Sequence, residues 1–352
     1  MDNLNKDIIR EMKNESLRYI TDSSPGYFRQ KNRNVFTYYD TEGNKIKDEA
    51  ILARIKELVI PPAWEKVWIS PIKNGHMQAT GIDEKGRKQY IYHSDWTKIA
   101  QENKFSKMID FGLSLPKIRN KVRYDMKIKG MDKRKIIATI IWLLEHTFVR
   151  IGNEEYQKEN NSYGLTTLRN KHAKVRGSEI VFRFRGKHGV ENIIEVTNKE
   201  VAKTIKKCIE LPGYELFQYI DEDNNRHVID SQDVNDFLGE VTKDEFSAKD
   251  FRTWGATNLS SRLLYEAGNL ETTKEIQSKV RDTVKKVASH LNNTVSVCRN
   301  YYIHPVVINT YTKKILVPHF NNQKKNKTQI TGLSWNEEAL VKLLQKYSGK
   351  KT

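Results

Sequence analysis

The chain is 352 residues long and carries 61 Lys and Arg residues against 44 Asp and Glu residues, a formal net charge of +17. This length exceeds what one hydrophobic core usually holds, so two domains are expected. The charge favours a polyanionic partner, and 16 Tyr and 6 Trp residues suit phosphate contacts and base stacking. DNA or RNA is therefore the expected partner, and a solvated basic surface without a ligand is the alternative.

Several classes of protein are excluded by what the sequence lacks. The two cysteines, Cys208 and Cys298, support neither a disulfide framework nor a zinc site, which predicts a reducing, intracellular location. The N-terminus has no signal-peptide core, and the strongest apolar run, residues 136–144, is far below the ~20 residues that cross a bilayer. Neither a GxxxxGK(S/T) loop nor a GxGxxG motif is present, so a soluble protein without a nucleotide site is expected.

The first part of the chain has the pattern of short strands separated by turns. Residues 34–46 predict a hairpin around Glu42-Gly43-Asn44, and residues 49–58 predict a short helix. Residues 66–93 predict a meander of three strands, with turns at Asn74-Gly75 and Lys85-Gly86. We therefore expect a small β-rich domain over residues 1–96.

Beyond Trp96 the apolar period changes from two to about 3.6, which predicts helices. The clearest helical face is formed by Ile136, Ile137, Ile140, Ile141, Leu144 and Phe148, and Arg150 follows at its end. Residues 178–196 break this pattern by strand alternation around "GKHG", which predicts a hairpin with Lys187 at its tip.

Two further helices are predicted near the C-terminal half. One begins at Ser247, with Asp250 as a capping-box residue and Arg252 in its first turns. The other ends at Asn292-Asn293, and its apolar face consists of Ile276, Val280, Val284, Val287 and Leu291. The Lys-rich stretch at 321–327 is expected to be a solvated loop. The predicted class is α+β, with a mainly α-helical domain over residues 97–352.

One acidic stretch, "DEDNNRHVIDSQ" at 221–232, begins like a calcium-binding loop. Arg226 stands where such a loop needs glycine, and Gln232 stands where it needs a bidentate glutamate. We interpret it as an acidic turn. No paired acidic motif for two magnesium ions stands out, so no metal site is predicted.

Four stretches carry the candidate chemistry, and two more precede them. The four are "FVRIGNEEY" (148–156), "FRGKHG" (184–189), "SAKDFRTWGAT" (247–257) and "NNTVSVCRNYYIHP" (292–305). In this order they resemble the small DNA topoisomerases of type IB from poxviruses and bacteria. Residues 60–71 and 74–93 are similar to the N-terminal domain of the bacterial members. The resemblance covers most of the chain from about residue 25 to 310, and it is specific because the motifs occur together.

The resemblance implies relaxation of supercoiled duplex DNA without ATP. In this family a tyrosine attacks a phosphodiester, leaves a 3′-phosphotyrosyl link and a free 5′-hydroxyl, lets the duplex rotate, and religates the strand. The nucleophile carries over to Tyr302, directly before "IHP", while Tyr301 is expected to pack or to contact a phosphate. The resemblance assigns Arg150 and Arg252 to the transition state, where permanently charged, forked guanidiniums suit the extra charge on the non-bridging oxygens.

The remaining catalytic roles also follow from the resemblance. Lys187 matches the general acid that protonates the leaving 5′-oxygen. Asn293, nine residues before Tyr302, stands where poxvirus relatives have histidine and bacterial ones often have asparagine, so it can donate a hydrogen bond but cannot transfer a proton. No residue is identified as the base for Tyr302, whose free phenol has a pKa of ~10. No cofactor is implied as required, and no divalent cation as obligatory.

Six residues match family positions that contact DNA: Arg87, Gln89, Tyr90, Tyr92, Tyr156 and Lys249. Their side chains are of the types that bind phosphates and base edges. Strand alternation places Gln89 on the face opposite Tyr90 and Tyr92, so these three cannot all point at one DNA surface. Packing within the sheet is the alternative for each tyrosine.

The expectation is a monomeric, cytoplasmic and nucleoid-associated clamp that closes on double-stranded DNA. A tyrosine recombinase is the nearest alternative among enzymes, because it uses the same set of Arg, Lys, Arg and Tyr residues on a related catalytic fold. Recombinases usually have histidine three residues before the second arginine, where this chain has Lys249. A basic DNA-binding protein without catalysis is the rival from another class.

Overall fold

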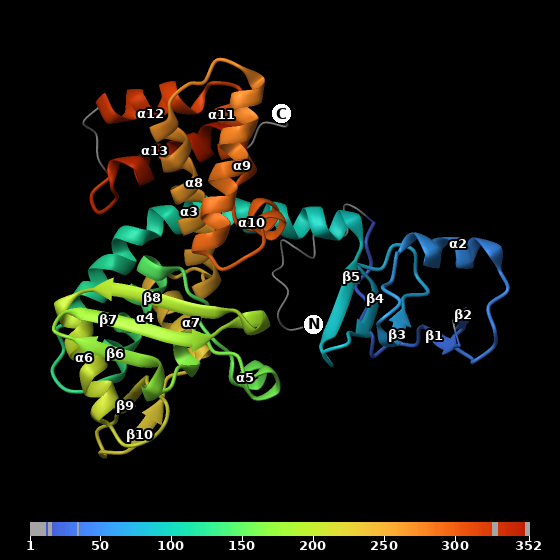
Figure 1. Ribbon diagram of the computed structural model, residues 1–352, viewed down its shortest axis with the longest axis horizontal. Helices are drawn as coiled ribbons and strands as arrows, with labels where there is room; N and C mark the ends of the chain where they lie inside the picture. The colour runs from blue at the N-terminus through green and yellow to red at the C-terminus, as the bar shows by residue number, and fades with distance from the viewer. Residues whose placement is uncertain (1–11, 13–15, 34, 326–329, 349–352) are drawn as a thin grey trace. The chain divides into compact units, whose positions relative to one another are not determined.

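The computed structural model describes residue 12 and residues 16–33, 35–325 and 330–348. The chain divides into two compact units, Met1–Phe105 and Ser106–Thr352, and the division falls within helix α3 (Ser94–Asp125). Figure 1 shows the first unit built on a sheet and the second built mainly of helices. The predicted α+β class is confirmed.

The first unit contains a five-stranded antiparallel sheet with the strand order β2-β1-β3-β4-β5. Its elements are β1 (Tyr27–Asn32), β2 (Val35–Tyr39), α2 (Glu49–Glu57), β3 (Glu65–Ile69), β4 (Met77–Ile82) and β5 (Lys88–Tyr92). The predicted meander is confirmed as β3, β4 and β5. Helix α2 is also confirmed, and it begins where the Asp48 side chain accepts hydrogen bonds from two backbone N–H groups.

The predicted hairpin around Gly43 is present only as a turn closed by a single bridge between Tyr39 and Lys45. Strand β2 pairs along its length with β1 instead. The sequence "YFRQKN" of β1 is largely polar and mostly exposed, so it lacks the alternation that identifies a half-buried strand. This is why the sequence did not predict β1.

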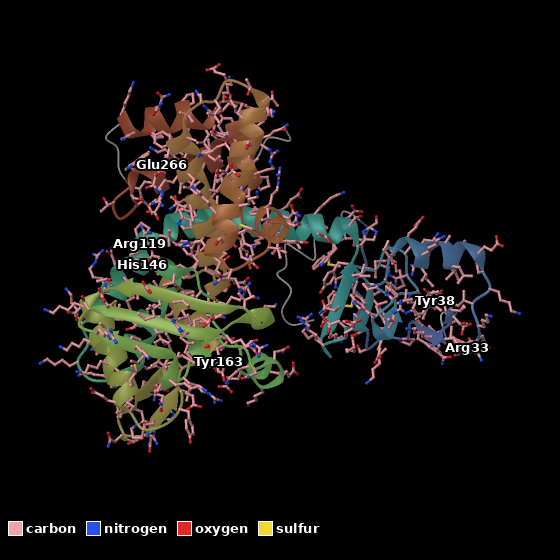
Figure 2. All side chains as sticks on the ribbon, in the orientation of Figure 1. Arg33, Tyr38, Arg119, His146, Tyr163 and Glu266 are labelled. Carbon is pink, nitrogen blue, oxygen red and sulfur yellow. The ribbon has the colours of Figure 1, made fainter. Side chains whose placement is uncertain are left out.

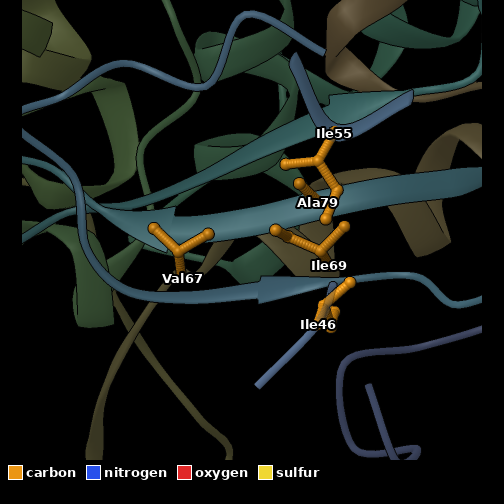
Figure 3. Packing of buried hydrophobic residues seen from close by; sticks show 5 residues of the cluster. All are labelled: Ile46, Ile55, Val67, Ile69 and Ala79. Carbon is orange, nitrogen blue, oxygen red and sulfur yellow. The ribbon is translucent and has the colours of Figure 1, made fainter. Parts of the chain in front are cut away.

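The core of the first unit is a small aliphatic cluster. Figure 3 shows its five buried members, Ile46, Ile55, Val67, Ile69 and Ala79. They come from helix α2, strands β3 and β4, and the segment after β2. Burial of these side chains holds the sheet against the helix, since apolar surface removed from water contributes about 25 cal/mol per Å².

The second unit is mainly helical. Its helices after α3 are α4 (Lys133–Thr147), α5 (Glu154–Asn160), α6 (Lys199–Glu210), α7 (Ser231–Thr242), α8 (Ala248–Ala267), α9 (Thr273–His290), α10 (Val295–Tyr301), α11 (Pro305–Thr312), α12 (Leu316–Lys325) and α13 (Trp335–Tyr347). Helix α4 is buried on nearly every face from Lys135 to Leu144, and it ends at Thr147, one residue before Phe148. It therefore forms the centre of this unit rather than an amphipathic surface helix.

Two small sheets complete the second unit. Strands β6 (Ala173–Arg176), β7 (Glu179–Arg185) and β8 (Glu191–Thr197) form an antiparallel sheet in that order. Strands β9 (Gln218–Ile220) and β10 (Arg226–Val228) form a hairpin whose turn lies within the predicted acidic turn. The predicted hairpin of β7 and β8 is confirmed by pairing of Arg185 with Glu191, which leaves Lys187 in the connecting turn.

One sequence prediction is wrong in this unit. Residues 321–325 of the expected loop are the last part of helix α12, and residues 326–327 lie outside the described residues. The helix buries Leu316, Val317 and Phe320 on its inner face, so this packing stabilises a C-terminal turn that is Lys-rich and exposed. No helix within the described part of the chain is long and apolar enough to span a bilayer.

Candidate active site

The predicted nucleophile, Tyr302, is the C-cap of the short helix α10. Its backbone N–H donates to the carbonyl of Cys298 at 3.1 Å. The hydroxyl of Thr257 in α8 donates to the Tyr302 carbonyl at 3.0 Å and accepts from the backbone N–H of His304, also at 3.0 Å. Tyr302 is half-buried, whereas Tyr301 is 43 % exposed. One buried threonine thus holds the backbone on both sides of the Tyr302–Ile303 segment.

Arg252 lies beside this tyrosine and is almost fully buried, with 4 % of its surface exposed. One terminal nitrogen donates to the carbonyl of Phe148, and the other donates to the carbonyl of Leu291 at 2.9 Å. The guanidinium carbon is 5.2 Å from the centroid of the Tyr302 ring. The third nitrogen, Nε, is buried and has no hydrogen-bond partner among the described residues.

The electrostatics of Arg252 are those of a cation removed from water. Burial lowers its pKa from the ordinary arginine value, the charge of Arg150 lowers it further, and Tyr302 opposes both effects. Because Arg252 is buried and lies close to the charge of Arg150, a nearby anion would stabilise its charged form. A phosphate oxygen would supply both the negative charge and an acceptor for Nε.

Arg150 is placed by a short segment after helix α4 that pairs with residues 164–166. Its carbonyl accepts from Leu165 at 2.9 Å, and the Ile151 carbonyl accepts from Thr166 at 2.7 Å. This approach needs glycine, because a Cβ added to Gly164 would lie 2.4 Å from the nitrogen of Gly152. The backbone thus holds Arg150 in place, while its side chain donates from Nη2 to Asn293.

Asn293 contacts Arg150 directly. Its Oδ1 accepts from Nη2 of Arg150 at 3.0 Å. Its Nδ2 is buried without a hydrogen-bond partner among the described residues. A buried donor without an acceptor costs about 1–3 kcal/mol, so this amide nitrogen, like Nε of Arg252, suits an acceptor that comes from a ligand.

Lys187 is exposed in the turn between β7 and β8. The turn is closed by a hydrogen bond from the Gly186 N–H to the Val190 carbonyl at 2.8 Å. Tyr163, labelled in Figure 2, donates its backbone N–H to the carbonyl of Arg185 at 2.8 Å and so holds the base of the turn.

A cavity of about 390 Å³ brings three of the predicted catalytic residues together. Its lining includes Arg150, Lys187 and Arg252. Tyr302 and Asn293 join this group through the ring contact with Arg252 and the hydrogen bond to Arg150. All five predicted catalytic residues therefore belong to one connected cluster in the second unit.

The predicted DNA contacts of the first unit fall into two pairs. Arg87 and Gln89 both donate to one oxygen of Asp83, with Arg87 Nη2 at 2.6 Å and Gln89 Nε2 at 3.0 Å. The hydrogen bond from Arg87 lowers the pKa of the Asp83 carboxyl to about 2. Tyr90 and Tyr92 are exposed on strand β5, and their rings are stacked with centroids 5.9 Å apart.

The predicted contacts of the second unit lie on two helices. Lys249 is exposed in the first turn of α8. Tyr156 falls within α5, but its side chain lies outside the described residues.

Sequence reasoning missed two parts of the site. Thr257 was not singled out, although it bonds to the backbone of Tyr302 and of His304. Asn192 of strand β8 was also not singled out, and its Oδ1 accepts from Nδ2 of Asn292 at 2.6 Å. No local pattern could have identified either, because their partners are 45 to 100 positions away in the chain. Across the described residues, no three His, Cys, Asp or Glu side chains cluster as metal ligands.

Comparisons with known proteins identify the family to which the chain belongs. Residues 93–330 match the catalytic core of eukaryotic DNA topoisomerase I, and residues 35–83 match the N-terminal domain of bacterial DNA topoisomerase IB. The chain is 31 % identical to DNA topoisomerase 1B of Acanthamoeba polyphaga mimivirus, over 92 % of this chain and 95 % of that protein.

More distant relatives match a shorter part of the chain. The vaccinia virus (strain Copenhagen) DNA topoisomerase 1B is 25 % identical over 65 % of this chain and 70 % of its own length. The DNA topoisomerase 1 of Mycosarcoma maydis is 24 % identical over 64 % of this chain and 24 % of its own length. The chain belongs to the DNA topoisomerase IB family, as the resemblance predicted. It is thus a DNA-acting enzyme of this class.

Proposed function

We propose that the chain relaxes supercoiled duplex DNA through a transient covalent bond between Tyr302 and a DNA 3′-phosphate. The observation that carries the proposal is the buried Arg252 guanidinium, 5.2 Å from the centre of the Tyr302 ring, with Nε lacking a partner among the described residues. A scissile phosphate in contact with both groups would satisfy this donor and compensate the buried charge.

In the proposed step, Oη of Tyr302 attacks phosphorus and the bond from phosphorus to the 5′-oxygen breaks. The phosphorane carries extra charge on its non-bridging oxygens, which Arg150 and Arg252 stabilise best where water is excluded. Asn293 Nδ2 donates a further hydrogen bond to one of these oxygens. Religation is the reverse step, in which the 5′-hydroxyl attacks and the Tyr302 oxygen leaves.

Lys187 is proposed to protonate the departing 5′-oxygen, which would otherwise leave as an unstable alkoxide. Its place in the turn supports this role, because the turn carries it to the cavity that Arg150 and Arg252 also line. The proposed chemistry uses charge from two guanidiniums and a proton from lysine, so it needs no obligatory metal, cofactor or nucleotide. No side chain is assigned as a base for Tyr302, so its hydroxyl proton is proposed to leave to water.

DNA contact by the first unit is proposed to use the stacked, exposed pair Tyr90 and Tyr92. Arg87 and Gln89 donate to Asp83, and we propose that they also contact DNA at this end of the strand. Lys249 and Tyr156 are proposed to contact DNA from the second unit. We propose that residues 1–96 and 97–352 act as a DNA-binding and a catalytic domain of a monomeric clamp on DNA in the cytoplasmic nucleoid.

Relaxation of supercoiled plasmid in EDTA without ATP tests the proposal. The expected result is a ladder of relaxed topoisomers and, after rapid denaturation, protein covalently joined to a DNA 3′ end. Folded protein that binds DNA without relaxing it or forming the adduct would support a non-catalytic binder. Exchange of strands between two duplexes as the main product would favour a tyrosine recombinase.

A further inference from the structure

The turn between helices α9 and α10 makes a separate contact with each element of the candidate active site. The carbonyl of Leu291 accepts from Arg252, the side chain of Asn292 donates to Asn192, and the side chain of Asn293 accepts from Arg150. Helix α10, whose C-cap residue is Tyr302, follows directly. Three consecutive residues thus join both arginines, the sheet that carries Lys187, and the nucleophile's helix.

The Asn292 contact reaches the turn that carries Lys187. Nδ2 of Asn292 donates to Oδ1 of Asn192 at 2.6 Å, and Nδ2 of Asn192 donates to the carbonyl of Val190 at 2.9 Å. The same carbonyl accepts from the backbone N–H of Gly186. The two amides therefore form a chain of hydrogen bonds from the α9–α10 turn to both ends of the Lys187 loop.

The Asn192 end of these hydrogen bonds is closely packed. Asn192 is 7 % exposed although it lies on strand β8 next to the loop. A Cβ on Gly186 would lie 2.3 Å from the Asn192 amide nitrogen, so the loop rests directly on this amide. Both asparagines line the cavity that Arg150, Lys187 and Arg252 share.

The backbone of Asn292 is also shaped for this position. Asn292 has a φ of 48°, in the left-handed region, and closes helix α9 with its N–H bonded to the Ser289 carbonyl at 3.1 Å. The next N–H, of Asn293, bonds to the Ala288 carbonyl at 3.0 Å, which completes a Schellman motif. Glycine would fit this conformation at least as well. Asparagine tolerates this left-handed conformation and, unlike glycine, carries a side-chain amide that can bond to Asn192.

We propose that the Asn192–Asn292 amide pair is a positioning contact that holds the Lys187 loop in place relative to the helix of Tyr302. This inference rests on the proposed function, in which Lys187 protonates the 5′-oxygen. Neither asparagine touches the reacting atoms in this proposal. They would affect catalysis only by positioning Lys187. Their loss should therefore slow only the protonation of the leaving 5′-oxygen.

The test is single-turnover cleavage of a short duplex by Asn292→Gly, which removes the amide and keeps the backbone conformation. Two substrates are compared, one with the ordinary 5′-oxygen and one with a 5′-bridging sulfur, whose thiolate leaves with little help from an acid. We expect cleavage of the ordinary DNA to slow by roughly five- to twentyfold, the scale of a lost hydrogen bond. On the sulfur substrate the rate should return to within about threefold of wild type.

Controls separate a positioning role from a loss of stability. Asn224→Gly is matched, since Asn224 also has a positive φ, 65°, but lies in the exposed turn between β9 and β10. It should cleave both substrates like the wild type. Asn192→Ala removes the other half of the bond and should reproduce the Asn292→Gly pattern. Combining both changes should slow the ordinary substrate no more than the stronger single change, because the two act through one contact.

Other outcomes would overturn the proposal. If Asn292→Gly and Asn192→Ala cleave ordinary DNA like the wild type, the contact has no positioning role. If both substrates slow equally in folded variants, the pair supports the site as a whole and not Lys187. Failure of the wild-type protein to form the covalent adduct would instead reject the proposed function, so the two failures are distinguishable.

Discussion

At the scale of single residues, the two adjacent tyrosines differ in burial and in their local contacts. Tyr302 is half-buried, lies against the Arg252 guanidinium and has its backbone held by Thr257. Tyr301 is exposed on helix α10. The surroundings of Tyr302 provide a fixed backbone and a positive charge, and a neighbouring positive charge favours the ionised form of a phenol.

We predict that Tyr302→Phe ends covalent adduct formation and leaves DNA binding nearly unchanged, because phenylalanine keeps the ring and removes the attacking oxygen. Tyr301→Phe is the matched control and should still cleave. The measurement is trapping of protein on labelled duplex by denaturant, together with binding measured by gel shift. Adducts that persist in Tyr302→Phe and vanish in Tyr301→Phe would identify Tyr301 as the nucleophile.

A second prediction concerns His304, two residues after Tyr302, which is 5 % exposed. Burial lowers its pKa to about 4, and Nδ1 accepts from the backbone N–H of Val306 as the N-cap of α11. The unfolded chain takes up the proton near pH 6.5, well before the folded chain does. Stability from this group is therefore fully present above pH 6.5 and falls as the pH drops toward 4, by roughly 3 kcal/mol at most.

The change His304→Asn keeps a capping acceptor and removes the titration. We expect the difference in unfolding free energy between pH 7.5 and pH 4.5 to be smaller in this variant than in the wild type. Urea unfolding followed by circular dichroism at both pH values measures it. An equal loss of stability on acidification in both proteins would show that His304 is not the group responsible.

At the scale of elements, the packing of helix α8 at Gly255 is as important for the site as its residue Arg252. Gly255 lies one turn after Arg252, and a Cβ there would be 2.2 Å from the ring of Phe148. Phe148 is the left-handed C-cap of α4, and its carbonyl accepts from Arg252. The close packing of α4 and α8 at this point therefore decides where the Arg252 side chain lies.

We predict that Gly255→Ala destabilises the protein by about 1–3 kcal/mol, the usual range for overpacking, and slows DNA cleavage because Phe148 must move. Gly239→Ala is the matched control, since Gly239 is also helical and its added Cβ would meet nothing closer than 3.8 Å. That change should be neutral or slightly stabilising. Thermal unfolding and single-turnover cleavage measure both effects. Equal behaviour of the two variants would contradict the packing argument.

At the scale of the whole molecule, local patterns predicted elements well and tertiary contacts poorly. The capping box of Ser247 and Asp250, the β3–β5 meander and the Lys187 turn were all predictable, because each depends on neighbours in sequence. The site residues came from a family resemblance and stay predictions. The long-range hydrogen bonds around the site were not predictable from the sequence. Arg252 bonds to Phe148, 104 positions away, and Asn292 bonds to Asn192, 100 positions away.

The net charge of +17 is a property of the whole molecule, to which many residues contribute. If the charge serves DNA binding, each phosphate that the protein neutralises releases condensed counterions and adds ~0.9 to the negative slope of log K against log salt. We therefore predict a steep loss of affinity for duplex DNA between 50 and 200 mM salt, on the order of a hundredfold or more if at least four phosphates are contacted.

Tyr302→Phe is the protein to use for this measurement, because it separates binding from cleavage. Fluorescence anisotropy of a labelled duplex at several salt concentrations gives the slope. A duplex with several phosphates replaced by neutral methylphosphonates is the control, and it should bind more weakly with a shallower slope because fewer counterions are released. A nearly flat response on both duplexes would mean that the positive charge is a solvated surface, and the basic-clamp interpretation would then be wrong.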